Sequence, residues 1–303
     1  MKRYLGFLLK VAVSLGLLYY LLRHTDLATL WQTIRQISPS WFAAAFLCYL
    51  VFQMISTFRW QLICKSLDFK RDYIYFLKLY FINQYFNAFL PGLLGGDIIR
   101  VGYLLKDGAS KTAATLSVFY DRAFGFLGAL LLVGISLPFE GGFLPPTTKK
   151  TLYLIFGSGL LFCMVLLFLK KFWGQKLQNY HLLLASAVFR LRVFLALLFL
   201  GLLVQTFYSI HLFFLSCGLN LPVPLSKYLI IVPIMGILAA MPVSLGGLGI
   251  REGALVYFLR LLGFGAEYGL ALGILVYAVA LLGGAIGGVI YFTRGSDQRP
   301  KDV

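Results

Sequence analysis

Apolar runs about as long as a membrane is thick recur along the whole 303-residue chain. A transmembrane helix needs about 20 such residues, and the runs lie near 5–22, 41–64, 73–90, 112–137, 151–169, 193–217, 228–241 and 266–292. Because hydrophobic residues make up 60% of the chain and charged residues only 13%, a soluble or disordered protein is excluded. The sequence therefore predicts an all-α polytopic membrane protein, with a single transmembrane domain over residues 1–303.

A short motif occurs twice in the chain. Residues 91–104 read PGLLGGDIIRVGYL, and residues 242–255 read PVSLGGLGIREGAL. The two motifs begin 151 residues apart (242 − 91), and the same offset carries each apolar run of the first part onto or near a run of the second. Two similar halves, about 1–145 and 146–303, are therefore predicted.

Proline and glycine interrupt the apolar runs at both motifs, where a continuous helix cannot form. We expect each motif to be the tip of a re-entrant hairpin that enters the membrane and returns to the same side. Each half then has three full spans, so the second half is inverted relative to the first. With both termini in the cytoplasm, the inner segments hold more than twice as many Lys and Arg as the outer ones, as topology requires. Weaker helical segments at 27–38 and 178–190 are predicted to lie on the membrane surface.

The chain holds 27 Lys and Arg against 11 Asp and Glu, which gives a net charge of +16. Membrane topology explains most of this excess, and attraction to anionic lipid headgroups is a second consequence. The basic residues are scattered between apolar runs, so nucleic acid is not an expected partner. No hydrolase, phosphate-loop or metal motif occurs, so we expect no metal, no cofactor and no enzymatic activity.

Several ionisable residues fall at membrane depth. Arg59 lies in the second apolar run, Asp121 and Arg122 lie in the fourth, and Asp97 and Glu252 lie at the two motifs. Each would cost about 2.5–3.5 kcal/mol if it faced lipid unpaired. We therefore expect them to face the interior and to pair, for example Asp97 with Arg122 or Glu252 with Arg59. Such a network is either purely structural or a headgroup site whose carboxylates carry protons.

An arginine follows the Gly-Gly pair of each motif, Arg100 in the first and Arg251 in the second. A guanidinium beside a helix N-terminus suits a phosphate, and we expect the glycines to turn through positive φ and expose backbone N–H groups to it. Alternatively, the glycines only let helices pack closely and the arginines reach a surface. Asn83 and Asn87 share a helix face and either cap the broken backbone or bind the headgroup. The predicted binding site comprises Arg59, Asn83, Asn87, Gly95, Gly96, Asp97, Arg100, Asp121, Arg122, Gly246, Gly247, Arg251 and Glu252.

These motifs together resemble one known family. The pattern N-x-x-x-N-x-x-L-P-x-x-x-G-G-D-x-x-R at 83–100, then Asp121-Arg122, then P-x-S-x-G-G-x-G-x-R-E-G at 242–253, is similar to the lysylphosphatidylglycerol synthase transmembrane region, or flippase-like, family. The resemblance covers nearly the whole chain, although the family usually has Glu where this chain has Asp121. It implies lipid movement across a bacterial or archaeal cytoplasmic membrane. The resemblance also supports assigning five residues to the binding site, namely Asp97, Arg100, Arg122, Arg251 and Glu252.

We therefore predict a lipid translocator that works by alternating access. Its partner would be an anionic phospholipid or a polyprenyl-phosphate-type lipid, and lipid-synthesis enzymes are further candidate partners. One alternative is a membrane component of lipid modification, like a phosphatidylglycerol lysyltransferase, although no soluble catalytic domain is expected in this sequence. Another is a non-transporting scaffold of a lipid-synthesis complex, which would have no need of intramembrane charge.

Overall fold

The computed structural model describes residues 2–89, 95–173, 188, 190–241, 243–244 and 246–293, with the backbone alone at 2–10, 89, 160–164 and 166–173. All regular structure in these residues is helical, which confirms the predicted all-α class. The helices are α1 (Lys2–Arg23), α2 (Leu27–Arg35), α3 (Pro39–Ser66), α4 (Tyr73–Phe89), α5 (Gly95–Lys106), α6 (Lys111–Ser136), η1 (Leu137–Phe139), α7 (Pro146–Trp173), α9 (Leu191–Gly218), α10 (Leu225–Ala240), α11 (Ile250–Leu261) and α12 (Ala266–Thr293).

Four of these elements are long and apolar enough to cross a membrane, namely α3, α6 continued by η1, α9 and α12. They coincide with four of the predicted apolar runs. The remaining runs also form helices, since α1 and α7 cover 5–22 and 151–169, while α4 and α10 closely match 73–90 and 228–241. The prediction of a polytopic helical membrane protein is therefore confirmed.

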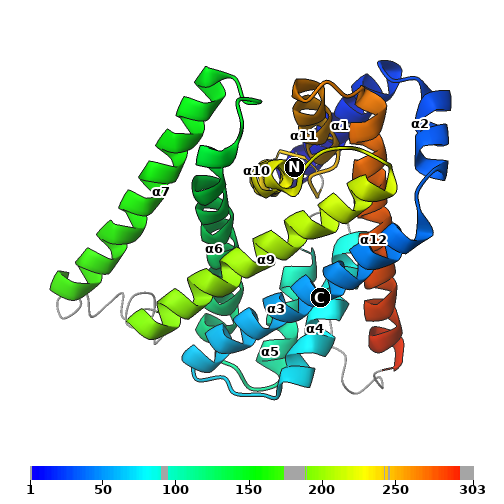
Figure 1. Cartoon of the computed structure of the whole chain (residues 1–303). Helices are drawn as coiled ribbons and strands as arrows, with labels where there is room; N and C mark the ends of the chain where they lie inside the picture. Colours follow the sequence, from blue (N-terminus) through cyan, green and yellow to red (C-terminus); the bar gives the residue numbers. More distant parts are fainter. Residues whose placement is uncertain are drawn as a thin grey trace.

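Corresponding helices of the two parts of the chain run in opposite directions (Figure 1). In this view α6 rises from the bottom of the molecule and α12 descends from the top, while α3 and α9 lie side by side and run antiparallel. The short helices α4 and α5 lie at one end, and α10 and α11 lie near the other. The order of elements from α3 to α6 is repeated from α9 to α12. Inverted halves would have this arrangement, although the inversion across a membrane stays a prediction.

Glycines allow the central helices to approach closely. A Cβ atom at Gly128 of α6 would meet the backbone of Gly201 in α9, and one at Gly287 of α12 would meet the backbone of Phe81 in α4. Small residues are the usual means by which membrane helices pack without a hydrophobic driving force. These two contacts set α6 against α9 and α12 against α4.

The connection between α6 and α7 also holds the start of α10. The buried Glu140 carboxylate accepts hydrogen bonds from Lys149 Nζ at 3.0 Å and from the Leu144 backbone at 3.2 Å, while Lys227 of α10 donates to the Glu140 carbonyl. Burial opposes ionisation of Glu140, but the hydrogen bonds that its carboxylate accepts outweigh it and hold its pKa below the usual range. The first part of the chain is thus tied to α10, whose far end reaches the site.

The surface helix predicted at 27–38 forms as α2. Asp26 caps its N-terminus by accepting a hydrogen bond from the Ala28 backbone at 2.9 Å. Leu30 is buried, whereas Trp31 is exposed and carries the Arg35 guanidinium 4.7 Å above its ring. The position of α2 at a membrane surface remains an expectation. The counterpart predicted at 178–190 lies almost wholly outside the described residues.

Candidate functional site

Both motifs interrupt a helix, as the sequence predicts. The first break separates the end of α4 at Phe89 from the start of α5 at Gly95, and the second separates Ala240 of α10 from Ile250 of α11. The motif residues Pro91, Leu94, Pro242 and Leu245 lie outside the described residues. Each break leaves the first backbone N–H groups of the following helix without helical partners, so local side chains or a ligand must satisfy them.

The glycines differ between the two breaks. Gly246 and Gly247 have φ values of 60° and 80°, as expected for a left-handed turn. Gly96 instead lies in the first turn of α5, where a Cβ would meet the side chains of Asn83 and Asn87. Its N–H donates to Asn87 Oδ1 at 3.1 Å, so it is not open to a phosphate. Of the two roles considered for Asn87, the structure supports capping, while Gly95 begins the same helix.

Asp121 of α6 joins two arginines from other helices. Its Oδ1 accepts from Arg59 Nε at 2.9 Å and Nη2 at 2.8 Å, a two-pronged contact, and its Oδ2 accepts from Arg100 Nη1 at 3.0 Å. All three side chains are at most 5% exposed. Breaking such a buried pair leaves an uncompensated charge, at a cost of about 3–5 kcal/mol. Asp121 therefore fixes α3, α5 and α6 around one point.

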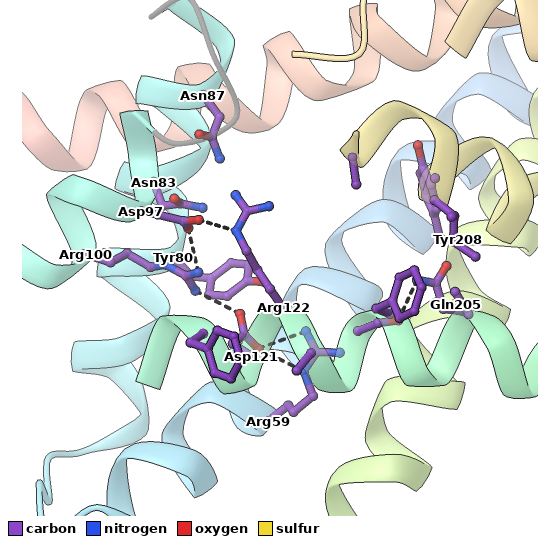
Figure 2. A pocket seen from close by; sticks show the side chains of 18 of the residues that line it. Arg59, Tyr80, Asn83, Asn87, Asp97, Arg100, Asp121, Arg122, Gln205 and Tyr208 are labelled. Carbon is purple, nitrogen blue, oxygen red and sulfur yellow. Dashed lines mark hydrogen bonds and ion pairs between the residues drawn. The ribbon is translucent and has the colours of Figure 1, made fainter. Parts of the chain in front are cut away.

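Asp97 extends this network toward an open space. Its Oδ1 accepts from Arg100 Nη2 at 2.8 Å, and its Oδ2 accepts from Arg122 Nε. The predicted pair of Asp97 with Arg122 is thus present, and Figure 2 shows the Arg122 guanidinium standing beside the Asp97 carboxylate. Arg122 differs from the other members because its side chain is 41% exposed. The network thus has a buried part and one accessible arginine.

Aromatic rings complete the surroundings of Arg100. Its guanidinium lies 4.7 Å from the ring centroid of Trp60 and 5.2 Å from that of Tyr80. Trp60 in turn donates to Ser117 Oγ at 3.2 Å. Cation–π contacts of this kind are worth up to about 2 kcal/mol when desolvated. Arg100 therefore has carboxylates at one end and rings around it, which suits a structural role more than direct contact with a ligand.

A cavity of about 640 Å³ adjoins this network. Its walls come from α3, α4, α5 and α6 on one side and from α9 and α10 on the other. Of the predicted site residues, it is lined by Arg59, Asn83, Asn87, Asp97, Arg100, Asp121 and Arg122. Within the described part of the chain, the buried Asn83 Oδ1 has no hydrogen-bond partner. The volume is typical of sites for small ligands or headgroups.

The second motif lies apart from this cavity. Arg251 donates to the Gly246 carbonyl at 3.4 Å, and Glu252 accepts the Gly249 N–H at 2.7 Å in a capping contact. Neither side chain is among the described residues that line the cavity. Arg59 pairs with Asp121, so the pair of Glu252 with Arg59 considered from the sequence does not form. The structure thus brings seven of the predicted residues together, all from the first half. The cavity lining does not include the other six, namely Gly95, Gly96, Gly246, Gly247, Arg251 and Glu252.

Sequence reasoning missed the opposite wall. Gln205 and Tyr208 of α9 line the cavity, and Figure 2 shows them across from Arg122. Gln205 Nε2 donates to the Gly125 carbonyl of α6 at 3.2 Å, which ties the two walls together. A glutamine inside an apolar run was a visible signal, because a polar side chain at that depth needs a partner. Gly236 of α10, a small residue without a chemical signal, also lines this wall.

Comparison with known proteins places the chain in one family. Searches of curated proteins and of solved structures found no significant match to the chain. The family model described as the lysylphosphatidylglycerol synthase TM region matches residues 7–288, which include both motifs and every helix that borders the cavity. The chain therefore belongs to the lysylphosphatidylglycerol synthase TM region family.

Proposed function

We propose that the protein moves an anionic lipid across the membrane, with the lipid headgroup passing through the cavity at Arg122. The observation that carries the proposal is a half-exposed arginine on a buried ion network that lines a cavity of about 640 Å³. Ionisable groups inside a membrane protein are costly and usually mark a substrate pathway. Membership of a family named for a lipid synthase fits a lipid substrate. The proposed movement involves no chemical step.

The apolar chains of such a lipid would run along α6. Phe119, Arg122 and Phe126 are spaced three and four residues apart, so they lie on one helix face. Both phenylalanines line the cavity, yet they are 58% and 46% exposed. A guanidinium between two accessible phenyl rings suits a molecule with one charged end and long apolar chains. The chains would stay in the bilayer while the headgroup occupies the cavity.

Replacing the accessible arginine tests the proposal. In vesicles reconstituted with purified protein, Arg122→Gln should slow the movement of a fluorescent phosphatidylglycerol by about tenfold or more, because one charged hydrogen bond is worth about 1.5–3 kcal/mol. Its melting temperature should stay near that of the wild type, since Asp97 keeps its contact with Arg100. Lipid movement is measured by the quenching of label in the outer leaflet.

Arg35→Gln is the matched control, because Arg35 is a surface arginine of α2 away from the cavity. It should leave the rate unchanged. If Arg122→Gln moves lipid at the wild-type rate, the headgroup does not pass this residue. If wild-type vesicles are no faster than protein-free ones, the translocator proposal fails and a scaffold or a lipid-modifying component becomes the better account.

The proposal includes inverted halves in a bacterial or archaeal cytoplasmic membrane, with both termini inside. The opposite directions of α6 and α12 support it. Thr112 and Arg260 are exposed and lie near the start of α6 and the end of α11. These two helix ends lie at opposite ends of the molecule in Figure 1. In a variant without native cysteines, Arg260→Cys should react with an impermeant maleimide on intact cells, and Thr112→Cys only after permeabilisation. Labelling of both from one side would refute the inversion.

A further inference from the structure

The charged side chains of the cavity do not balance. The described lining residues include three arginines and two aspartates, namely Arg59, Arg100, Arg122, Asp97 and Asp121. From this surplus of one positive charge we infer that the cavity binds a monoanionic phosphodiester headgroup in preference to a dianionic phosphomonoester. The inference rests on the proposed function and narrows it to one class of headgroup.

The surplus charge is located at Arg122. Asp121 and Asp97 are enclosed, with side chains 4% and 8% exposed, and between them they contact all three arginines. Arg59 and Arg100 are equally enclosed, so the buried part of the network has two positive and two negative charges. Burial strongly favours such neutrality. Arg122 shares Asp97 with Arg100 and faces the cavity, so it is where a ligand's negative charge would be compensated.

The other walls add no net charge. From α4 the cavity is lined by the phenol of Tyr80 and by amides, from α9 by Gln205 and the phenol of Tyr208, and from α10 by uncharged residues. Arg251 and Glu252 of α11 are not among the described residues that line the cavity. A second negative charge on the headgroup would therefore find no partner among the described residues. It would also face the carboxylates of Asp97 and Asp121, and like charges repel strongly where water is scarce.

Two lipids with identical acyl chains test this selectivity in zwitterionic phosphatidylcholine nanodiscs that contain the full-length protein. Phosphatidylglycerol is a phosphodiester with one negative charge at pH 5 and at pH 9. Phosphatidic acid is a phosphomonoester, which loses its second proton between these values. Affinity is measured for both lipids at both pH values by displacement of a fluorescent lipid. Lipid movement plays no part in this readout.

We expect phosphatidylglycerol to bind equally at both pH values. Phosphatidic acid should bind as tightly as phosphatidylglycerol at pH 5, and its affinity should be lower by about tenfold or more at pH 9. The net charge of +16 on the whole chain would by itself favour the dianion, so the expected result is opposite to that of a general attraction. His211 packs behind Tyr208 with ring centroids 6.0 Å apart, and any effect of pH on the protein itself would change the binding of both lipids alike. The phosphatidylglycerol series therefore controls for changes in the protein.

A variant with one more positive charge should reverse the preference. Gln84 lines the cavity and is only partly buried, so Gln84→Lys adds a charge without breaking the ion network. It should strengthen binding of phosphatidic acid at pH 9 by about tenfold and change phosphatidylglycerol binding less. Gln84→Met is the uncharged control: it changes the same wall of the cavity, so any loss of affinity should be equal for the two lipids, and the preference for phosphatidylglycerol at pH 9 should remain.

Two outcomes would overturn the inference, and they differ in what else they affect. If phosphatidic acid at pH 9 binds as tightly as phosphatidylglycerol, and both bind weakly to Arg122→Gln, the site holds a headgroup but does not select by charge. Only the inference then fails. If Arg122→Gln binds both lipids as the wild type does, the cavity is not the headgroup site, and the proposed function fails with it.

Discussion

Asp121→Asn is expected to destabilise the protein by about 3–5 kcal/mol, a large fraction of the stability of a typical fold. The change keeps the shape of the side chain but removes the charge that Arg59 and Arg100 share. Arg100 retains Asp97, whereas Arg59 has no other described carboxylate within ion-pair distance and stays buried with its charge. The free energy of unfolding in detergent micelles measures this loss.

A double-mutant cycle separates the ion pair from the general effect of substitution. Arg59→Met should also be destabilising, but combining it with Asp121→Asn should cost less than the sum, because the stranded charge is gone. Asp121→Glu keeps the charge and should be the mildest change. Additive effects of the two substitutions would show that Arg59 and Asp121 do not stabilise one another, and the network would lose its proposed structural part.

The repeat predicted the fold better than it predicted the site. Matching Pro, Gly and Arg residues place a helix break in each half, and both breaks are found. The partners of these residues do not repeat. Counting 151 residues on from Arg59, Asp97, Asp121 and Arg122 leads to Ile210, Leu248, Leu272 and Gly273. Arg251 therefore lacks the carboxylates that surround Arg100, which explains why the charged site gathers in the first half.

Other features depended on packing that no local pattern encodes. Asn87 follows Asn83 by one turn, and only the approach of Gly96 to both side chains shows that Asn87 caps α5. The contact of Gln205 with the Gly125 carbonyl joins residues 80 positions apart. Such pairs are decided by how α6 and α9 cross. The charges could thus be predicted from their cost in a membrane, whereas Gln205 could be noticed as a polar residue but its partner and its place in the far wall could not be predicted.

That far wall allows the cavity to be filled without disturbing the fold. Gly236 of α10 lines the cavity, and a Cβ atom added there would meet no atom within 4 Å. We expect Gly236→Phe to reduce lipid movement in reconstituted vesicles by about a hundredfold, since a ring would occupy the space that the headgroup needs. Gly236→Ala and Gly236→Leu should give smaller, graded losses. Stability should hold or rise by about 0.5–1 kcal/mol as a helical glycine is removed.

Gly253 of α11 offers a matched control for this series. A Cβ atom at Gly253 likewise meets nothing within 4 Å, but Gly253 is not among the described residues that line the cavity. Gly253→Phe should therefore leave lipid movement at the wild-type rate and the melting temperature close to it. A Gly236→Phe protein that is stable and still moves lipid normally would place the pathway elsewhere. Of these two glycines, Gly236 lines the cavity and Gly253 does not. Equal losses of lipid movement at both positions would therefore point to a general effect of bulky side chains on the helices.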